Sequence, residues 1–331
     1  MLPVHKFTIS DDSKETVLAA MRQHLPDKPS WSAVRKILRG RFVAIGGVLC
    51  VDEARRLGNG EVVTISDRPL PPPPTDKDVN VRYVDDEVVI VEKPSGMITL
   101  RRASDLCWSW ARKNQQPTLD ECVPRLIGEH AANKSNSERI HQRLPRLLSV
   151  HRIDRDSSGL LVFARNEEAQ TKIIHQFAQH DAVRKYLALI PGTIAEQTIK
   201  SQFTRDRGDG LRGSTTDTSI GEQAITHFRT LRTIGEYSEL ECRLETGRTN
   251  QIRIHLAELG HPICGDIKYR GAFEQPPVCD ESKVHRMALH ATELNFKHPT
   301  TKKLLQFKTP WPADMLRFLH RLQAEAKQRN E

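Results

Sequence analysis

The run from residue 151 to residue 165 limits the possible folds of this chain more than any other stretch. It begins with charged and small polar residues, and from Gly159 onward it is an apolar run of the kind that forms a buried strand. Asp154 lies between Arg152 and Arg155 just before this strand, so a core element fixes its position and nearby positive charge favours its ionised form. An ion-paired turn is the commoner role of such an aspartate, and a catalytic carboxylate is the alternative.

The length, charge and cysteine spacing of the chain limit its number of domains, its partners and its cellular location. A chain of 331 residues suffices for one large domain with an appendage or for two ordinary domains. Its 50 Lys and Arg against 42 Asp and Glu give a net charge of +8, which suits a polyanionic partner. The six cysteines have no Cys-x-x-Cys spacing, so we expect reduced thiols and no metal site. There is no apolar signal core and no run of membrane-spanning length, so we expect a cytoplasmic protein without a membrane partner.

Residues 1–67 are predicted to form a separate small module. A strand at residues 6–9 precedes a helix capped by Asp11 or Asp12, and a second helix begins after Ser30. Two further strands are expected at residues 42–48, with a Gly-Gly turn, and at residues 61–65.

The order of helix, basic turn, strand, glycine turn and final strand resembles the small RNA-binding module typified by ribosomal protein S-four. Its usual Val-Asn-Gly becomes Ile45-Gly46-Gly47, and its usual Gly-Asp becomes Gly60-Glu61. The resemblance implies phosphate contacts that give affinity without reading sequence. The residues expected to make them are Arg35, Lys36, Arg39 and Arg41. A solvated helix face is the commoner explanation for scattered charge of this kind.

Residues 68–78 are predicted to be a linker, because consecutive prolines are extended and cannot join a sheet interior. Residues 79–331 are then the main domain. Within it, residues 101–148 are the least informative: Trp108 and Trp110 alternate with basic residues, which fits either RNA stacking or an irregular insertion with buried tryptophans.

Further along the main domain, Thr249 is expected to cap a helix that ends near Gly260.

Three stretches of the main domain resemble motifs of the RluA-type pseudouridine synthases, in the same order. Residues 151–159 are similar to His-Arg-Leu-Asp-x-x-Thr-Ser-Gly, and Asp154 falls on the catalytic aspartate. Residues 184–188 are similar to Lys-x-Tyr-x-Ala, with Arg184 in place of the lysine and Tyr186 retained. Residues 246–256 are similar to Thr-Gly-Arg-x-His-Gln-Ile-Arg-Val-His-Leu, with Asn250 in place of the first histidine.

The resemblance implies an α+β fold, in which a mixed, mostly antiparallel sheet carries a central catalytic cleft and the small N-terminal α/β module is appended. It implies isomerisation of uridine to pseudouridine in structured RNA, without cofactor or metal. Asp154 would act on the nucleotide either as a nucleophile or as a base at the sugar. Arg253 would orient that carboxylate, with a two-point grip as one means, while Tyr186 packs on the base and Arg152 binds RNA.

Ribosomal RNA of the large subunit is the expected substrate, and transfer RNA is the alternative. We expect a monomer without an obligate protein partner. Two other classes compete: a non-catalytic RNA-binding protein, and a metal-dependent nuclease. The nuclease would need clustered acidic ligands, and His151 with Asp154 between arginines makes a poor cation site.

Overall fold

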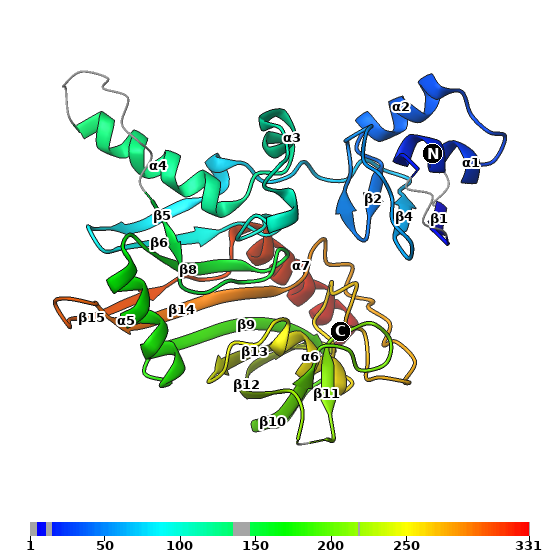
Figure 1. The fold of residues 1–331 in the computed structure, drawn as a ribbon. Helices are drawn as coiled ribbons and strands as arrows, with labels where there is room; N and C mark the ends of the chain where they lie inside the picture. The colour runs from blue at the N-terminus through cyan, green and yellow to red at the C-terminus, as the bar shows by residue number, and fades with distance from the viewer. Residues whose placement is uncertain (1–4, 11–14, 135–145, 218, 331) are drawn as a thin grey trace. The chain divides into compact units, whose positions relative to one another are not determined.

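Figure 1 shows the computed structural model, which describes residues 5–10, 15–134, 146–217 and 219–330. The chain divides into two compact units: residues 1–73 with 104–117, and residues 74–103 with 118–331. The first boundary falls inside the segment expected to be a linker. The segment 104–117, which lies within the expected main domain, groups with the N-terminal unit instead.

The first unit contains a four-stranded antiparallel sheet in the order β1-β4-β2-β3. Its elements are β1 (His5–Thr8), α1 (Val17–His24), α2 (Trp31–Arg39), β2 (Val43–Ile45), β3 (Val48–Leu49), β4 (Val62–Ile65) and, from the second segment, α3 (Trp110–Gln115). Ser30 Oγ accepts the Ala33 N–H, which confirms the expected cap of α2. The cap expected at Asp11 or Asp12 lies outside the described residues. Helix α1 begins at Val17, and Thr16 is its N-cap residue.

The core of this unit forms where α1 and α2 pack on the sheet. Val34 and Leu38 of α2 are fully buried, as are Val63 and Ile65 of β4. In the appended segment, Trp110 is 75% exposed, so it is not one of the buried tryptophans expected of an insertion.

The second unit is built on a large mixed sheet in the order β11-β10-β12-β13-β9-β14-β8-β6-β5, with β15 beside β14 and β7 beside β8. The strands are β5 (Asn80–Val84), β6 (Val88–Lys93), β7 (Leu148–Ser149), β8 (Ser158–Ala164), β9 (Val183–Pro191), β10 (Gln197–Thr204), β11 (Gly213–Thr215), β12 (Glu222–Ile234), β13 (Tyr237–Leu244), β14 (Leu289–Lys297) and β15 (Leu304–Lys308). The helices are α4 (Leu119–Lys134), α5 (Glu167–Ala178), α6 (Gln251–Glu258) and α7 (Ala313–Asn330). Short 3-10 turns occur at Asp76–Asp78 and Ala103–Asp105.

Among the described strands, only β8 and β14 pair in parallel, so the α+β class with a mostly antiparallel sheet is confirmed. β8 is the strand predicted from the apolar run, and all of its residues are buried. Leu161 and Phe163 face a core that includes residues of α4 and α7, whereas Leu160 and Val162 face a core with Ile173 of α5. Because helices cover both faces, this strand is apolar from Leu160 to Ala164 instead of alternating.

Helix α6 differs from the expectation at its first turn. It begins at Gln251, and the N-cap position is Asn250, which has φ 61° and makes no side-chain capping bond. The prediction that Thr249 caps this helix was therefore wrong. All but the last residue of α6 are buried, so an arginine on it projects into the protein and not into solvent.

No helix in the described part of the chain is both long and apolar enough to cross a membrane.

Candidate active site

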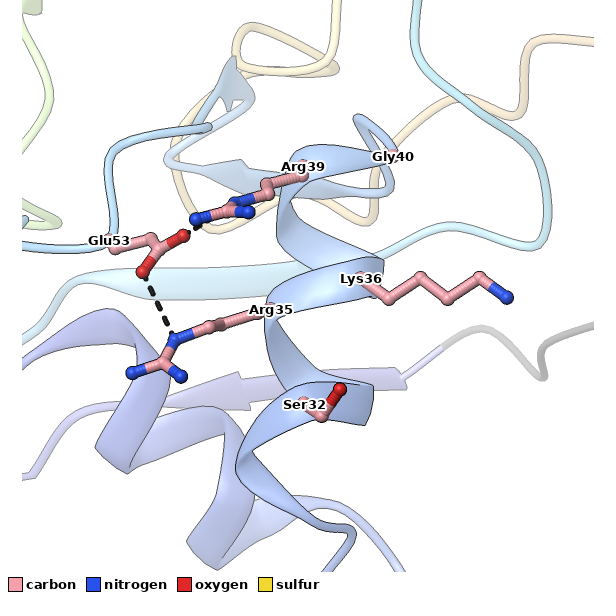
Figure 2. A pocket seen from close by; sticks show the side chains of 6 residues that line it. All are labelled: Ser32, Arg35, Lys36, Arg39, Gly40 and Glu53. Carbon is pink, nitrogen blue, oxygen red and sulfur yellow. Dashed lines mark hydrogen bonds and ion pairs between the residues drawn. The ribbon is translucent and has the colours of Figure 1, made fainter.

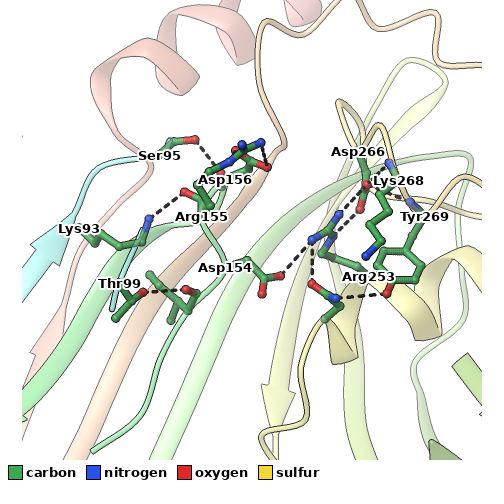
Figure 3. A network of polar contacts seen from close by, with 12 residues as sticks. Lys93, Ser95, Thr99, Asp154, Arg155, Asp156, Arg253, Asp266, Lys268 and Tyr269 are labelled. Atoms are coloured by element: carbon green, nitrogen blue, oxygen red, sulfur yellow. Dashed lines mark hydrogen bonds and ion pairs between the residues drawn. The ribbon is translucent and has the colours of Figure 1, made fainter. Parts of the chain in front are cut away.

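The loop that carries Asp154 connects β7 to β8, and hydrogen bonds hold its backbone on both sides of the aspartate (Figure 3). Thr99 Oγ1 donates to the Ile153 carbonyl at 2.8 Å. Lys93 Nζ donates to the Arg155 carbonyl at 2.9 Å. The last residue of β6 and the segment after it therefore fix the neighbours of Asp154, which limits the positions its carboxylate can take.

Lys93 itself is buried, with 1% of its surface exposed. Its ammonium also donates to the carbonyls of Pro94 at 2.8 Å and Met97 at 2.7 Å. Burial lowers the pKa of Lys93 to about 7, and the carboxylates of Asp156 and Asp154 oppose this fall. Three carbonyl acceptors match the three donors of an ammonium, so Lys93 ties the turn after β6 to the aspartate's loop.

The side chain of Asp154 points toward α6 and is 19% exposed. Its Oδ2 lies 3.3 Å from Nη1 of Arg253. Its Oδ1 accepts no hydrogen bond from the described residues. The sequence-predicted pair is thus together in space, although 99 residues separate the two in sequence.

Arg253 makes its two-point contact with a different carboxylate, that of Asp266. Its Nε donates to Asp266 Oδ2 at 2.6 Å and its Nη2 to Asp266 Oδ1 at 2.9 Å. Only Nη1 reaches toward Asp154, so a two-point grip on Asp154 is not what the structure shows. Asp266 is in turn held by the backbone N–H groups of Lys268 and Tyr269, at 2.8 and 3.0 Å.

Asp266 keeps the buried guanidinium charged. Burial of Arg253 acts to lower its pKa, but the hydrogen bonds and charge of Asp266, with a smaller effect of Asp154, raise the pKa above its ordinary value. The ring of Tyr269 lies against the same guanidinium, with 5.0 Å from its centroid to Cζ. Arg253 is therefore a fixed cation, anchored on one side and directed at Asp154 on the other (Figure 3).

The two arginines that flank Asp154 in sequence do not pair with it. Arg155 Nε donates to Asp156 Oδ1 at 2.8 Å, which closes an ion pair between neighbours. Arg152 is exposed. The positive charge in contact with Asp154 thus comes from Arg253 in α6, which the local pattern of residues 151–165 did not indicate.

Tyr186 lies on β9, between β13 and β14, and is 8% exposed. Burial raises the pKa of Tyr186 to about 12; the charge of Arg184 opposes the rise, and the charge of Asp154 adds to it. The phenol therefore keeps its proton at neutral pH and lies within the electrostatic reach of Asp154.

Arg184, which stands where the resembled motif has lysine, makes contacts that depend on its planar guanidinium group. Its Cζ lies 4.9 Å from the centroid of the Phe177 ring, and its Nη2 donates to the Glu245 carbonyl at 2.9 Å. A Cβ on Gly247 would come within 2.5 Å of its Nη1. The guanidinium thus occupies a space that a glycine keeps open.

His151 is committed to the fold. Its Nε2 accepts the Val162 N–H at 3.2 Å, and its ring meets Phe177 edge-on. Burial, aided by the charge of Arg184, lowers the pKa of His151 to about 3. An imidazole used in this way is not placed as a metal ligand, which counts against the nuclease alternative.

Three of the four basic residues expected to bind RNA in the N-terminal unit, Arg35, Lys36 and Arg39, lie on α2 (Figure 2). Arg35 and Arg39 donate to the two oxygens of Glu53, at 3.2 and 2.7 Å. Lys36 extends away from this pair, and all four residues line an open pocket of about 880 Å³. Arg41 follows the helix in the left-handed region, at φ 66°, and lines a neighbouring pocket.

The sequence interpretation gave no role to three polar residues of this site. Asp266 anchors Arg253, Asn250 contacts it, and the Lys268 ammonium lies 5.3 Å from the centroid of Tyr269. Asp266 and Tyr269 did carry a signal, because the spacing Gly265-Asp266-x-x-Tyr269 continues the resembled pattern.

Comparison with known proteins places this arrangement in a family. A family model described as RNA pseudouridylate synthase matches residues 87–258, more than half of the chain. The ribosomal large subunit pseudouridine synthase D of Xanthomonas campestris is 31% identical, over 96% of this chain and 97% of that protein. The protein of the same name from Vibrio cholerae is 30% identical, over 88% of this chain and 86% of its own length.

Among solved structures, human RNA pseudouridylate synthase domain containing 4 aligns with a TM-score of 0.55 at 20% identity, over 74% of this chain and 93% of that one, which supports the fold alone. The sequence relatives extend across both units, and the small antiparallel sheet with two helices fits the module typified by ribosomal protein S-four. The chain therefore belongs to the RluA-type pseudouridine synthases, the enzymes that isomerise uridine to pseudouridine within RNA.

Proposed function

We propose that this enzyme modifies uridines of large-subunit ribosomal RNA, with Asp154 as the carboxylate that acts on the target nucleotide. The support for the substrate is that relatives named for the large ribosomal subunit match it over nearly its whole length, including the N-terminal unit. The support for Asp154 is its contact with Arg253, a buried cation that Asp266 holds in place.

The reaction exchanges one bond for another. The bond between C1′ of the ribose and N1 of uracil breaks, and a bond between C1′ and C5 forms. C5 releases a proton and N1 gains one, so the product is an isomer and no water or oxidant is consumed. A target inside folded RNA must first leave its stack, at a cost of a few kcal/mol.

The surroundings of Asp154 suit a carboxylate that attacks or takes a proton. One oxygen contacts Arg253 and the other has no hydrogen-bond donor among the described residues. Such an oxygen is available to a substrate, whether Asp154 acts as a nucleophile at the sugar or as a base there. Tyr186, which keeps its proton at neutral pH, would pack against the base.

We expect Arg253→Lys to lower the single-turnover rate at least about tenfold, because lysine keeps the charge but lacks the planar fork that joins Asp266 to Asp154. Arg253→Ala should be slower still and less stable, since it leaves the fully buried Asp266 unpaired at a cost of about 3–5 kcal/mol. Rates measured across pH, with thermal unfolding of each variant, check both. A lysine variant as fast as wild type, or an alanine variant restored at high pH, would show that the guanidinium does not orient Asp154.

For the N-terminal unit, we expect the triple change of Arg35, Lys36 and Arg39 to alanine to weaken RNA binding and flatten its salt dependence. Each lost phosphate contact should reduce the log–log slope by about one unit. The matched control removes three exposed lysines of the second unit, Lys297, Lys303 and Lys308. If both triple variants lose the same slope, net charge explains the effect and α2 is not a phosphate-binding surface.

The substrate is tested by mapping pseudouridines in a strain that lacks this enzyme, using carbodiimide modification and primer-extension stops. We expect one or more sites in large-subunit ribosomal RNA to disappear and to return when the wild-type chain is supplied. Sites lost only from transfer RNA would contradict the ribosomal assignment and support the alternative.

A further inference from the structure

Asn250 occupies the junction between the loop after β13 and helix α6, in contact with Arg253, the residue that contacts Asp154. Its Oδ1 accepts from Arg253 Nη1 at 2.8 Å, and its Nδ2 donates to the Tyr269 hydroxyl at 3.1 Å. The direction of the amide is settled by chemistry, because a guanidinium has only donors and must face the oxygen. The amide therefore bridges Arg253 and Tyr269 in one orientation.

The two hydrogens of Arg253 Nη1 serve two acceptors. One is directed to Asn250 at 2.8 Å and the other to Asp154 at 3.3 Å. Nε and Nη2 are already bound to Asp266, so the guanidinium plane is set from one side by a carboxylate and from the other by the amide. Without the amide, Nη1 would have a single, longer contact to fix where its hydrogens point.

The charge of the acceptor matters as much as its position. Arg253 carries one positive charge, and Asp266 and Asp154 each carry one negative charge when ionised. A third carboxylate at position 250 would lie closer to Nη1 than Asp154 does, and would compete for the same cation. A neutral amide supplies the hydrogen-bond acceptor without that competition.

The resembled motif has histidine where this chain has Asn250. A neutral imidazole accepts through one nitrogen and donates through the other, so it can reproduce both contacts of the amide. An imidazolium cannot accept a hydrogen bond from Arg253 and would repel it. Histidine ordinarily titrates near pH 6.5, whereas an amide does not titrate at all.

We propose that Asn250 is a positioning residue that aims Arg253 Nη1 at Asp154 and makes this alignment independent of pH. The inference rests on the catalytic role proposed for Asp154. Other charged or titratable groups near Asp154 are Lys93 from β6, Tyr186 from β9, and Lys268 and Tyr269 from the loop after α6. They are common to wild type and the variants below, so they cancel in the comparison.

The test compares Asn250→Gly, Asn250→Asp and Asn250→His in the full-length enzyme. Asn250 has φ 61°, and glycine, aspartate and histidine all tolerate this left-handed conformation better than alanine. The measurement is the single-turnover rate at saturating RNA, from about pH 5.5 to about pH 8.5, a range that brackets the ordinary titration of imidazole. RNA affinity and thermal unfolding are measured for each variant, so that a fall in rate is separated from lost binding or folding.

We expect the glycine variant to lose roughly tenfold in rate with unchanged RNA affinity, because one charge-assisted hydrogen bond is gone. The aspartate variant should be slower than the glycine variant although it retains an acceptor. The histidine variant should approach the wild-type rate at about pH 8.5 and fall relative to wild type only at acid pH, below about 6.5, because the charge of Arg253 lowers the pKa of an imidazole beside it.

Three results would overturn the inference. An aspartate variant faster than the glycine variant would mean that a charged acceptor serves as well as a neutral one, so that the neutrality of the amide plays no part. A glycine variant as fast as wild type, or a histidine variant no faster than the glycine variant at about pH 8.5, would remove the positioning role. If the Asp154→Asn enzyme is inactive, these outcomes refute only the inference about Asn250. If the Asp154→Asn enzyme is active, the proposed function itself is refuted.

Discussion

We expect Gly159→Ala to give a protein that unfolds at much lower denaturant concentration than wild type, or does not fold at all. Gly159 has φ +114°, and an added Cβ would lie 2.2 Å from the Ala291 carbonyl oxygen on the paired strand β14. The backbone strain costs about 1–3 kcal/mol, and overpacking typically adds about 1–3 kcal/mol. The sum is a large part of the total stability of a domain, about 5–15 kcal/mol.

A matched control separates the two costs. Gly260 also has a positive φ, +79°, but an added Cβ there meets nothing within 4 Å. Gly260→Ala should therefore show the conformational cost alone. Urea unfolding of both variants tests the argument, and equal losses at the two positions would mean that close approach of β8 to β14 is not what requires glycine at 159.

The parts of the fold that the sequence predicts are those set by local periodicity. The apolar run after Gly159 predicts a buried strand, and β8 is buried along its whole length. The Ser30 cap and the glycine turn between β2 and β3 were also predictable, because each depends on residues within one turn of the chain. Local patterns fail where a residue's partner is distant in sequence.

The electrostatics of the candidate site show that failure. The pattern around Asp154 indicates two neighbouring arginines, yet one pairs with Asp156 and the other is exposed. The contact with Arg253 could be inferred only from the resemblance to a family, because 99 residues separate the two side chains. The pairing of Arg253 with Asp266 is fixed by the path of the chain after α6, which no periodicity specifies.

The prediction that Thr249 caps α6 was wrong for a related reason. Thr249 is a preferred N-cap residue, and position alone favours it. The structure instead places Asn250 there, with its side chain turned to Arg253 and Tyr269. A side chain that serves the site is not available to cap the helix, and sequence preference does not weigh that competition.

We expect Asp154→Asn to lower the rate of pseudouridine formation by at least about 10³-fold, as replacing a residue that acts in the chemical step does. Asparagine has nearly the same shape, so the fold should persist, but it is neither a nucleophile nor a base at neutral pH. RNA affinity should be equal or slightly greater, because one negative charge is removed beside a polyanion. Asp156→Asn is the control in the same loop, and its rate should stay within a few-fold of wild type because Asp156 pairs with Arg155 away from the Arg253 contact.

The most direct test is the single-turnover rate of wild type, Asp154→Asn and Asp156→Asn on one RNA that contains a mapped target uridine, with deamidation of the asparagine excluded by mass spectrometry. The account predicts pseudouridine with wild type and Asp156→Asn, and none above background with Asp154→Asn although the RNA is bound. Turnover by Asp154→Asn above a few percent of the wild-type rate would contradict it, because the carboxylate that Arg253 holds would then not be the group that acts on the nucleotide.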